Sequence, residues 1–317
     1  MKTFAAAAFL LPVFAAVQAA DQPYPSRPIR LVVSGVAGSS NFTARVIANG
    51  LSASLGQQVI VDGREGGVIA AETAARAAPD GYTLHLNGSA LWLLPFMRAR
   101  VPYDPVRDFM PVTLAVSTPN ILVVHPSVPV KSVRELIALA RAKPGELNYA
   151  TGNAGTSNHL AAELFKARAG VDMTRIPYKG GGPAITDLIA GQVHLMFGAA
   201  IAVIPHVQSG RLRALAVTSA RPSALAPGLP TVAEAGVPGY ESVAIFGVLA
   251  PARTPPALVA RLNGAIVSVL HQPEVRERLF KAGSEVVAST PEAFGAAIKA
   301  ELTTLGKLIR DAGIRDE

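Results

Sequence analysis

The sequence contains no cysteine, and this absence removes several kinds of chemistry at once. Disulfide bonds, thiolate metal sites, cysteine nucleophiles and lipid attachment through an N-terminal cysteine are all excluded. Aromatic residues make up only 6% of the chain, and the basic residues are scattered. Because nucleic-acid binding calls for basic patches with interleaved aromatic residues, we expect no nucleic-acid partner. The formal charge of +7 favours a small anionic ligand instead.

Long apolar runs are also missing after the first residues, so we expect no membrane span in the mature chain. The start combines Lys2, an apolar stretch over residues 4–17 and the small-residue end Val17-Gln18-Ala19, which is typical of a secretory signal. We therefore expect a signal peptide at residues 1–19 and an exported, soluble protein of the periplasm. The length of 317 residues suits two domains.

The motifs of common enzymes and cofactor sites do not occur. The chain has no Gly-x-Ser-x-Gly elbow, no phosphate loop and no Gly-x-Gly-x-x-Gly, and its six histidines lack metal-ligand spacing. Ser157 and His159 could be drawn as a hydrolase pair, but at a helix start two side chains so spaced diverge. We expect no catalytic residue, no metal and no cofactor, and hence no enzyme.

The chain does contain strands that alternate with helices through short loops, which indicates an α/β fold with parallel strand pairing. We expect strands at 29–33, 59–61, 83–86, 121–124, near 148, 175–178, 193–197, 212–217 and 245–249. Expected helices cover 41–54, 69–77, 183–191, 201–208, 256–270 and 291–312, and a capping box at Ser132 and Glu135 starts another. The region 220–239, rich in proline and glycine, is expected to be mostly loop.

Two α/β sets are joined near residues 112–124 and again near 240–250. The chain therefore passes from one lobe to the other twice. This predicts that the C-terminal helices complete the first lobe and that a hinge lies between the lobes. We expect lobe 1 to comprise residues 20–118 and 246–317, and lobe 2 to comprise residues 119–245.

The stretch 148–159 combines a short strand, a loop of small residues and a helix start. Its core, residues 154–158, has a near copy at residues 37–41, which also follows a strand and precedes a helix. Helix starts carry unpaired N–H groups and partial positive charge, so such loops can bind anions. We predict that two such loops, one from each lobe, close on one small anion. The predicted residues are Gly155, Thr156, Ser157, Gly38, Ser39, Ser40 and Asn41. The alternative is that small residues simply cap helices.

Further segments complete the predicted ligand-binding set, namely Gly66 and Gly67, Ser89 shortly before Trp92, and Lys179 with Gly180. The glycines would offer backbone donors and Lys179 a long-range attraction for an anion. The alternatives are a solvated lysine in a turn and a tryptophan buried in the core.

Several motifs then match a known family in order along the mature chain. They are Tyr24-Pro25-Ser26-Arg27-Pro28-Ile29-Arg30, Ala78-Pro79-Asp80-Gly81-Tyr82-Thr83-Leu84, Pro102-Tyr103-Asp104-Pro105, Gly155-Thr156-Ser157-Asn158-His159-Leu160, Pro177-Tyr178-Lys179-Gly180 and Leu212-Arg213-Ala214-Leu215-Ala216-Val217-Thr218. Together they resemble the substrate-binding receptors of tripartite tricarboxylate transporters, the Bug family. The resemblance implies a two-lobed, type II-like periplasmic binding protein with a ligand cleft between lobes. It also implies capture of a small carboxylate and its delivery to membrane transporter subunits.

The family's Gly-Thr-Ser loop is intact, but the other loops depart from its pattern. The first-lobe loop at residues 33–41 lacks one glycine and an aspartate, the loop at residues 63–68 is shorter, and Phe197-Gly198-Ala199 replaces the common Phe-Asp-Asn. Without the aspartate, we expect a plain carboxylate ligand rather than an amino acid. We expect the protein to be a monomer. Two alternatives to a transport receptor remain: a ligand-binding component that reports to a membrane sensor kinase, and a periplasmic serine hydrolase.

Overall fold

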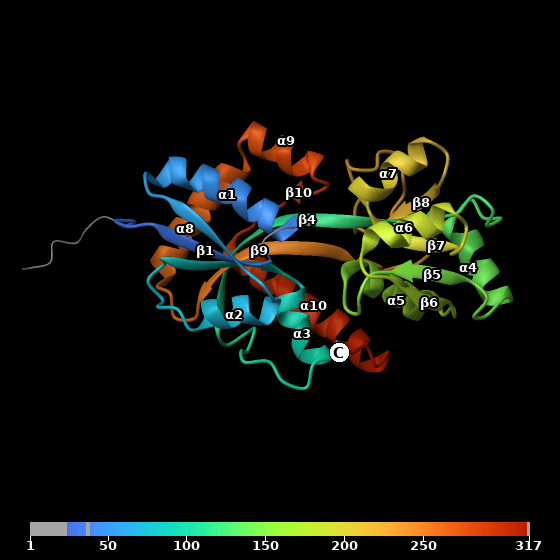
Figure 1. The fold of residues 1–317 in the computed structure, drawn as a ribbon, viewed down its shortest axis with the longest axis horizontal. Coiled ribbons are helices and arrows are strands. Elements are labelled where there is room, and N and C mark those ends of the chain that lie inside the picture. Colours follow the sequence, from blue (N-terminus) through green and yellow to red (C-terminus); the bar gives the residue numbers. More distant parts are fainter. Residues whose placement is uncertain (1–23, 36–38, 316–317) are drawn as a thin grey trace, which may run out of the picture.

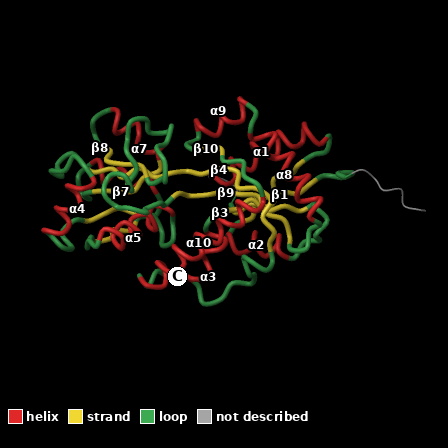
Figure 2. Tube along the Cα trace, turned by 180° about the vertical axis from the view of Figure 1, so that it is seen from behind, coloured by secondary structure: helices red, strands yellow, loops and turns green. Residues whose placement is uncertain are grey.

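The computed structural model describes residues 24–35 and 39–315 of the chain. Two α/β lobes are joined by two long antiparallel strands, β4 (Phe109–Val124) and β9 (Val243–Pro251), as Figures 1 and 2 show from opposite sides. The predicted signal peptide lies outside the described residues. None of the helices in the described ranges is long and apolar enough to cross a membrane.

The first lobe is built on the parallel strands β1 (Ile29–Ser34), β2 (Val59–Arg64) and β3 (Thr83–Gly88). Its sheet has the order β2-β1-β3-β9-β4, and the short strand β10 (Glu285–Val286) pairs with β4. One face packs against α2 (Gly67–Ala75), α3 (Ala90–Met97) and α10 (Pro291–Asp311). The other face packs against α1 (Ser39–Leu55), α8 (Pro256–Leu270) and α9 (Pro273–Lys281).

The second lobe contains the end of β4 with β5 (Asn148–Thr151), β6 (Thr174–Pro177), β7 (Leu195–Ala199) and β8 (Arg213–Val217). Strand β5 pairs in parallel with β6 and β7. Helices α4 (Val133–Ala142) and α5 (Ser157–Ala169) pack on one face, and α6 (Gly181–Ile189) and α7 (Ala200–Gln208) pack on the other.

The strand register turns the carboxyl ends of both sheets toward the junction between the lobes. Strand β4 pairs with β9 up to Pro119 and with β7 from Asn120 onward. In the first lobe, Gly88 at the end of β3 pairs with Phe246 in the junction half of β9. In the second lobe, Ala199 at the end of β7 pairs with Asn120. The loops after these parallel strands therefore face one another across β4 and β9, the place where α/β sheets bind ligands.

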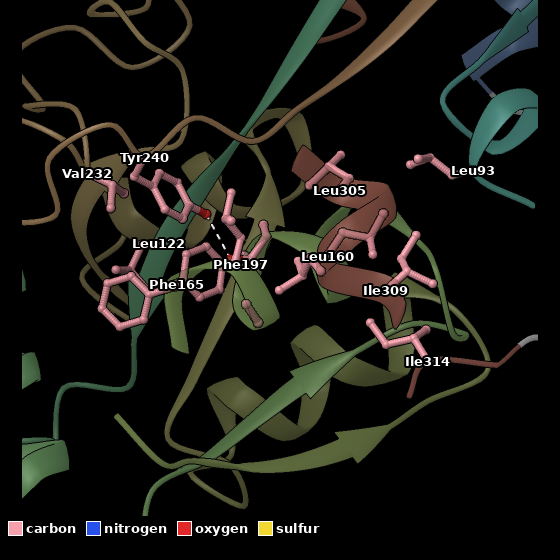
Figure 3. Packing of buried hydrophobic residues seen from close by; sticks show 14 of the residues in the cluster. Leu93, Leu122, Leu160, Phe165, Phe197, Val232, Tyr240, Leu305, Ile309 and Ile314 are labelled. Atoms are coloured by element: carbon pink, nitrogen blue, oxygen red, sulfur yellow. Dashed lines mark hydrogen bonds between the residues drawn. The ribbon is translucent and has the colours of Figure 1, made fainter. Parts of the chain in front are cut away.

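One apolar cluster runs through both lobes along the face that carries α5 and α10. Leu305 and Ile309 of α10 belong to the same buried cluster as Leu160 of α5 and Phe197 of β7, as Figure 3 shows. The two lobes are thus packed directly against each other beside the two connecting strands, in addition to being joined by them.

The predicted α/β two-lobed fold is confirmed, and most predicted strands and helices occur within a few residues of their expected bounds. The main difference is β4, which begins at Phe109 rather than at residue 121. Pro111 and Pro119 interrupt the sequence pattern of a strand, yet the strand continues through register shifts next to Pro111 and Leu114. Such irregularities let a sheet accommodate proline, which cannot donate a ladder hydrogen bond.

Helix α3 was not predicted, and the start of α6 differs from the expected one. The α3 sequence Ala-Leu-Trp-Leu-Leu-Pro-Phe-Met is apolar on every side and contains Pro95, so it has no helical period. Trp92 within it is fully buried, which fits the core alternative. Helix α6 begins at Gly181 rather than at Pro183, and β2 extends to Arg64, so the flexible loop predicted at 63–67 is short.

Candidate functional site

Six helices, α1, α2, α3, α5, α6 and α7, begin where parallel strands end at the junction between the lobes. None of the six has an acidic residue in its first turn, whereas α4, α9 and α10 carry Glu135, Glu274 and Glu292 there. Side chains cap α4 and α10, but no side-chain cap bonds to the start of α2, α3, α5, α6 or α7. Apart from α3, whose N-cap Ser89 lies near the Glu301 carboxyl group, these helix starts have no acidic residue in their own first turn to offset the positive end of the dipole, which suits an anionic ligand.

The loop between β5 and α5 keeps its shape through glycine and a capping threonine. Gly155 has a φ of 74°, and a Cβ at this position would lie 2.4 Å from Met97 Sδ at the end of α3. Thr156 is the N-cap of α5, and its hydroxyl donates to the Asn153 carbonyl at 2.7 Å. Ser157 opens the helix half-buried, and its hydroxyl has no hydrogen bond within the described part of the chain. The loop thus presents Ser157 and backbone N–H groups toward the junction.

Two side chains, Arg175 and His159, form hydrogen bonds to this loop and support it. The sequence patterns did not identify either residue as a support of the loop. Arg175 of β6 donates from Nε to Thr151 Oγ1 at 2.9 Å and from its guanidinium to the Gly152 carbonyl at 3.0 Å. The buried His159 accepts a hydrogen bond from the Gly155 N–H at its Nδ1, 3.1 Å away. Burial, helped by the nearby Arg175 charge, lowers the pKa of His159 to about 4, so the imidazole is neutral at neutral pH. Arg175 also adds positive charge beneath the α5 start.

On the first lobe, the predicted residues of α1 have different surroundings. Ser39 is exposed, and the Ser40 hydroxyl donates to the Ser34 carbonyl at 3.3 Å. Asn41 is buried: its amide donates to the Gly35 carbonyl at 3.1 Å and accepts from Arg45 Nε at 2.8 Å. In this structure Asn41 therefore supports the loop instead of facing the junction. Gly38, a predicted ligand-binding residue, lies outside the described residues.

The predicted glycines at α2 and α6 are open to solvent and have positive φ at the N-cap. Gly66 has a φ of 89° and Gly180 a φ of 109°, and both residues are exposed. Gly67 is the first residue of α2 and lies near Ser34 at the end of β1. A Cβ at Gly67 would lie 4.0 Å from the Ser34 Cβ. Lys179 is exposed beside Gly180. The structure thus brings the starts of α1 and α2 together in one lobe, and places the starts of α5 and α6 at the matching edge of the other.

Ser89 is set apart from the other predicted residues. Its hydroxyl is buried near the Glu301 carboxyl group without a hydrogen bond of ordinary geometry, and Trp92 Nε1 donates to Glu301 at 2.7 Å. Burial raises the pKa of Glu301 to about 7, although the Ser89 hydroxyl and the Trp92 N–H act against the rise. The ligand-binding role of Ser89 and of the other predicted residues stays a prediction.

A cavity of about 650 Å³ lies between α10, the connecting strands and the segments 219–222 and 239–242. Glu301 and Glu241 line it together with apolar residues of β4 and β9, and none of the predicted ligand-binding residues takes part. Sequence patterns could not indicate this cavity, because its walls come from segments far apart in the chain.

The hydrolase alternative finds no support in the geometry of Ser157 and His159. The histidine Nδ1 is occupied by the Gly155 N–H, and no hydrogen bond joins the imidazole to the Ser157 hydroxyl in the described residues. A general base must reach the hydroxyl that it activates. Within the same ranges, no cluster of three or more His, Asp or Glu side chains could hold a metal ion.

Comparison with known proteins gives a consistent answer. Residues 43–314 match the family described as "Tripartite tricarboxylate transporter family receptor". The protein BugT of Bordetella pertussis is 38% identical over 301 residues, covering 92% of this chain and 91% of BugT. The solved structure of R. palustris Rpa4515 with adipate is 37% identical with a TM-score of 0.75, covering 92% of this chain and 99% of that one. MatC of Rhodopseudomonas palustris with bound malate is 29% identical with a TM-score of 0.70, covering 90% of this chain and 100% of MatC.

The match over residues 43–314, the 38% identity to BugT and the fold shared with solved structures over nearly the whole chain lead to one assignment. This chain belongs to the family of tripartite tricarboxylate transporter receptors, which includes the Bug proteins.

Proposed function

We propose that this chain is a periplasmic receptor that captures a small carboxylate between its two lobes and delivers it to membrane transporter subunits. The observation that carries this proposal is the set of six helix starts at the junction, all without acidic first turns and five without side-chain caps. Relatives solved with adipate and with malate support a carboxylate as the ligand.

In this proposal the α5 start is the principal carboxylate site. The Ser157 hydroxyl and the first N–H groups of α5 donate to one carboxylate, while Arg175 beneath the loop supplies positive charge without direct contact. Hydrogen bonds to a charged group contribute about 1.5 to 3 kcal/mol each. A micromolar ligand needs about 8 kcal/mol in total, so a few such donors from the two lobes suffice.

The lobes close around the ligand by bending the connecting strands. We place the division at the predicted boundaries, with lobe 1 formed by residues 20–118 and 246–317 and lobe 2 by residues 119–245. The change of partners along β4 between Pro119 and Asn120 supports this division. The closed form is what the transporter subunits recognise, and no catalytic step is required. Residues 1–19 act as the export signal, and the receptor works as a monomer.

A melting screen tests the proposal directly. Native mass spectrometry first establishes that the purified protein carries no retained ligand. The protein is then heated with mono-, di- and tricarboxylates, aromatic acids and amino acids. A ligand present at 100 times its dissociation constant stabilises the folded state by about 2.7 kcal/mol, which raises the melting temperature measurably. If no carboxylate raises the melting temperature of the ligand-free protein, the proposed function is wrong.

A further inference from the structure

Three large apolar side chains are exposed in the first turns of helices that begin at the junction. They are Phe42 of α1, Ile69 of α2 and Ile201 of α7, with exposed fractions of 37%, 55% and 54%. Large apolar residues are seldom left in water without a reason when they gather at one place. None of the three helices has an acidic residue in its first turn, and the starts of α2 and α7 have no side-chain cap, so Ile69 and Ile201 stand next to N–H groups that are attractive to an anion.

The two first-lobe side chains lie on one rim. The start of α1 is tied to β1 by the bond from Ser40 to the Ser34 carbonyl, and the start of α2 lies near the same Ser34, whose Cβ would be 4.0 Å from a Cβ at Gly67. Helical side chains lean toward the N-terminus of their helix. Ile69 follows this rule, since its Cδ1 would lie 3.9 Å from a Cβ at Gly66. Its side chain therefore flanks the open end of α2.

The second lobe contributes an apolar wall of its own. From Gly198 to Val203 the β7–α7 segment contains no polar side chain at all. Ile201 reaches across toward the first lobe, where a Cβ at Gly283 would lie 3.0 Å from the isoleucine Cβ. Closure of the lobes brings this segment nearer to the first-lobe rim.

Some polar side chains at these loops are engaged and others are exposed, among them Glu65, Asn153 and Lys179. Arg64 is bound to Asp62 at 3.0 Å, and Arg175 is bound to the β5–α5 loop. Hydroxyl groups stand at two places, Ser39 on the first lobe and Thr156 with Ser157 on the second. Where the ligand packs on the three apolar side chains, a hydroxyl finds no hydrogen-bond partner in them and binding is weakened, whereas a methylene or aromatic group gains from the same burial.

Resting on the proposed function, we infer that the ligand is a carboxylate with an apolar body, an unhydroxylated aliphatic or aromatic acid. Its carboxylate binds the α5 start, and its apolar body packs on Phe42, Ile69 and Ile201. Hydroxy acids with the same carbon skeleton are discriminated against.

The test uses two pairs of acids that share a carbon skeleton and differ in hydroxylation, adipate with galactarate and hexanoate with gluconate. Isothermal titration of the ligand-free protein is expected to give at least about tenfold tighter binding for the unhydroxylated member of each pair. Phe42→Ser and Ile69→Ser should each weaken adipate or hexanoate binding about three- to tenfold and leave the hydroxylated acids unchanged. Val106→Ser is the matched control, because Val106 is 66% exposed in the loop before β4, at the end of that strand away from the junction.

The outcomes separate the two claims. Equal or tighter binding of galactarate or gluconate overturns the apolar-body inference and leaves a carboxylate receptor intact. An unchanged preference in both serine variants, with the fold verified by circular dichroism, also overturns it and indicates that these side chains face a transporter subunit instead. Absence of binding for these four acids overturns the inference, and absence of binding for every acid of the melting screen refutes the proposed function as well.

Discussion

A negative charge at the start of α5 should strengthen the fold and abolish ligand binding at the same time. Ser157 is the first residue of α5, and the first turn of this helix contains no acidic residue. In the substitution Ser157→Asp, a carboxylate meets the positive end of the helix dipole. Such a placement stabilises a protein by about 0.3 to 1 kcal/mol. For a domain of this size we expect a melting temperature raised by about 1 to 3 °C.

The same carboxylate occupies the place where the ligand's own carboxylate is proposed to bind. Two unit charges 4 Å apart repel by about 1 kcal/mol in bulk water and about 4 kcal/mol near a protein surface. Because Ser157 is half-buried, the larger value is the better guide. Ser157→Asp should therefore weaken carboxylate binding by roughly a hundredfold to a thousandfold. The repulsion should shrink as ionic strength rises.

Two further variants separate charge from shape and from general effects of helix starts. Ser157→Asn has the size of aspartate without its charge, so it should lose much less affinity than Ser157→Asp. Ala257→Asp places the same charge in the first turn of α8, which also lacks an acidic residue there and follows the end of β9 that lies away from the junction. It should raise the melting temperature and leave binding unchanged.

The measurements are a thermal melt without ligand and isothermal titration with whichever acid binds the wild-type protein. A Ser157→Asp protein that melts like the wild type or higher and still binds the acid with undiminished affinity would refute the placement of the carboxylate at α5. Equal losses in the Asp and Asn variants would show that volume rather than charge is responsible.

The remaining predictions concern the supports of the site. Gly155→Ala should cost at least about 1 kcal/mol and lower the melting temperature, because φ is 74° and the new methyl group meets Met97. Glu301 has a folded pKa near 7 against 4.5 unfolded, so it binds a proton in the folded state that the unfolded chain releases, and its contribution to stability falls as pH rises through that window. Glu301→Gln should therefore gain up to about 3 kcal/mol over wild type between pH 4.5 and 7, measured by urea unfolding. His85 is buried with its pKa lowered to about 4, so wild-type stability should fall as pH drops from 6.5 toward 4, and His85→Asn should flatten this loss.

The sequence was sufficient for the parts of the site that depend on local chemistry. Gly155 needs a left-handed backbone and Thr156 stands at the N-cap position of a helix, and both placements follow from residue type and position in a strand–loop–helix pattern. The two crossings between lobes were likewise expected near residues 112–124 and 240–250, although the strand predicted in the first of them began only at residue 121. These features need no knowledge of which distant segments touch.

The sequence failed where a role depends on contacts between distant residues. Arg175 supports a loop 23 and 24 residues away, and nothing in its neighbourhood marks it as a support. Asn41 was predicted to bind the ligand from its position, which stays a prediction, and the sequence did not show that its amide bonds to Gly35 and Arg45. Ser89 follows a strand in the expected way, yet it lies beside Glu301 of α10. Local pattern specifies where a helix starts, and only the fold decides which way a polar side chain there turns.

The uncapped helix starts at the junction lower the stability of the folded protein, and a bound ligand offsets this loss. A side-chain cap or an acidic first turn is worth roughly 0.3 to 2 kcal/mol to a helix, and α4 and α10 have both. Helices α2, α3, α5, α6 and α7 have neither, so the ligand-free protein forgoes several kcal/mol of stability at this one surface. A bound carboxylate supplies the missing acceptors to helices of both lobes at once. Since the ligand can satisfy both sets only when the lobes are close together, the same interactions that bind it also favour closure.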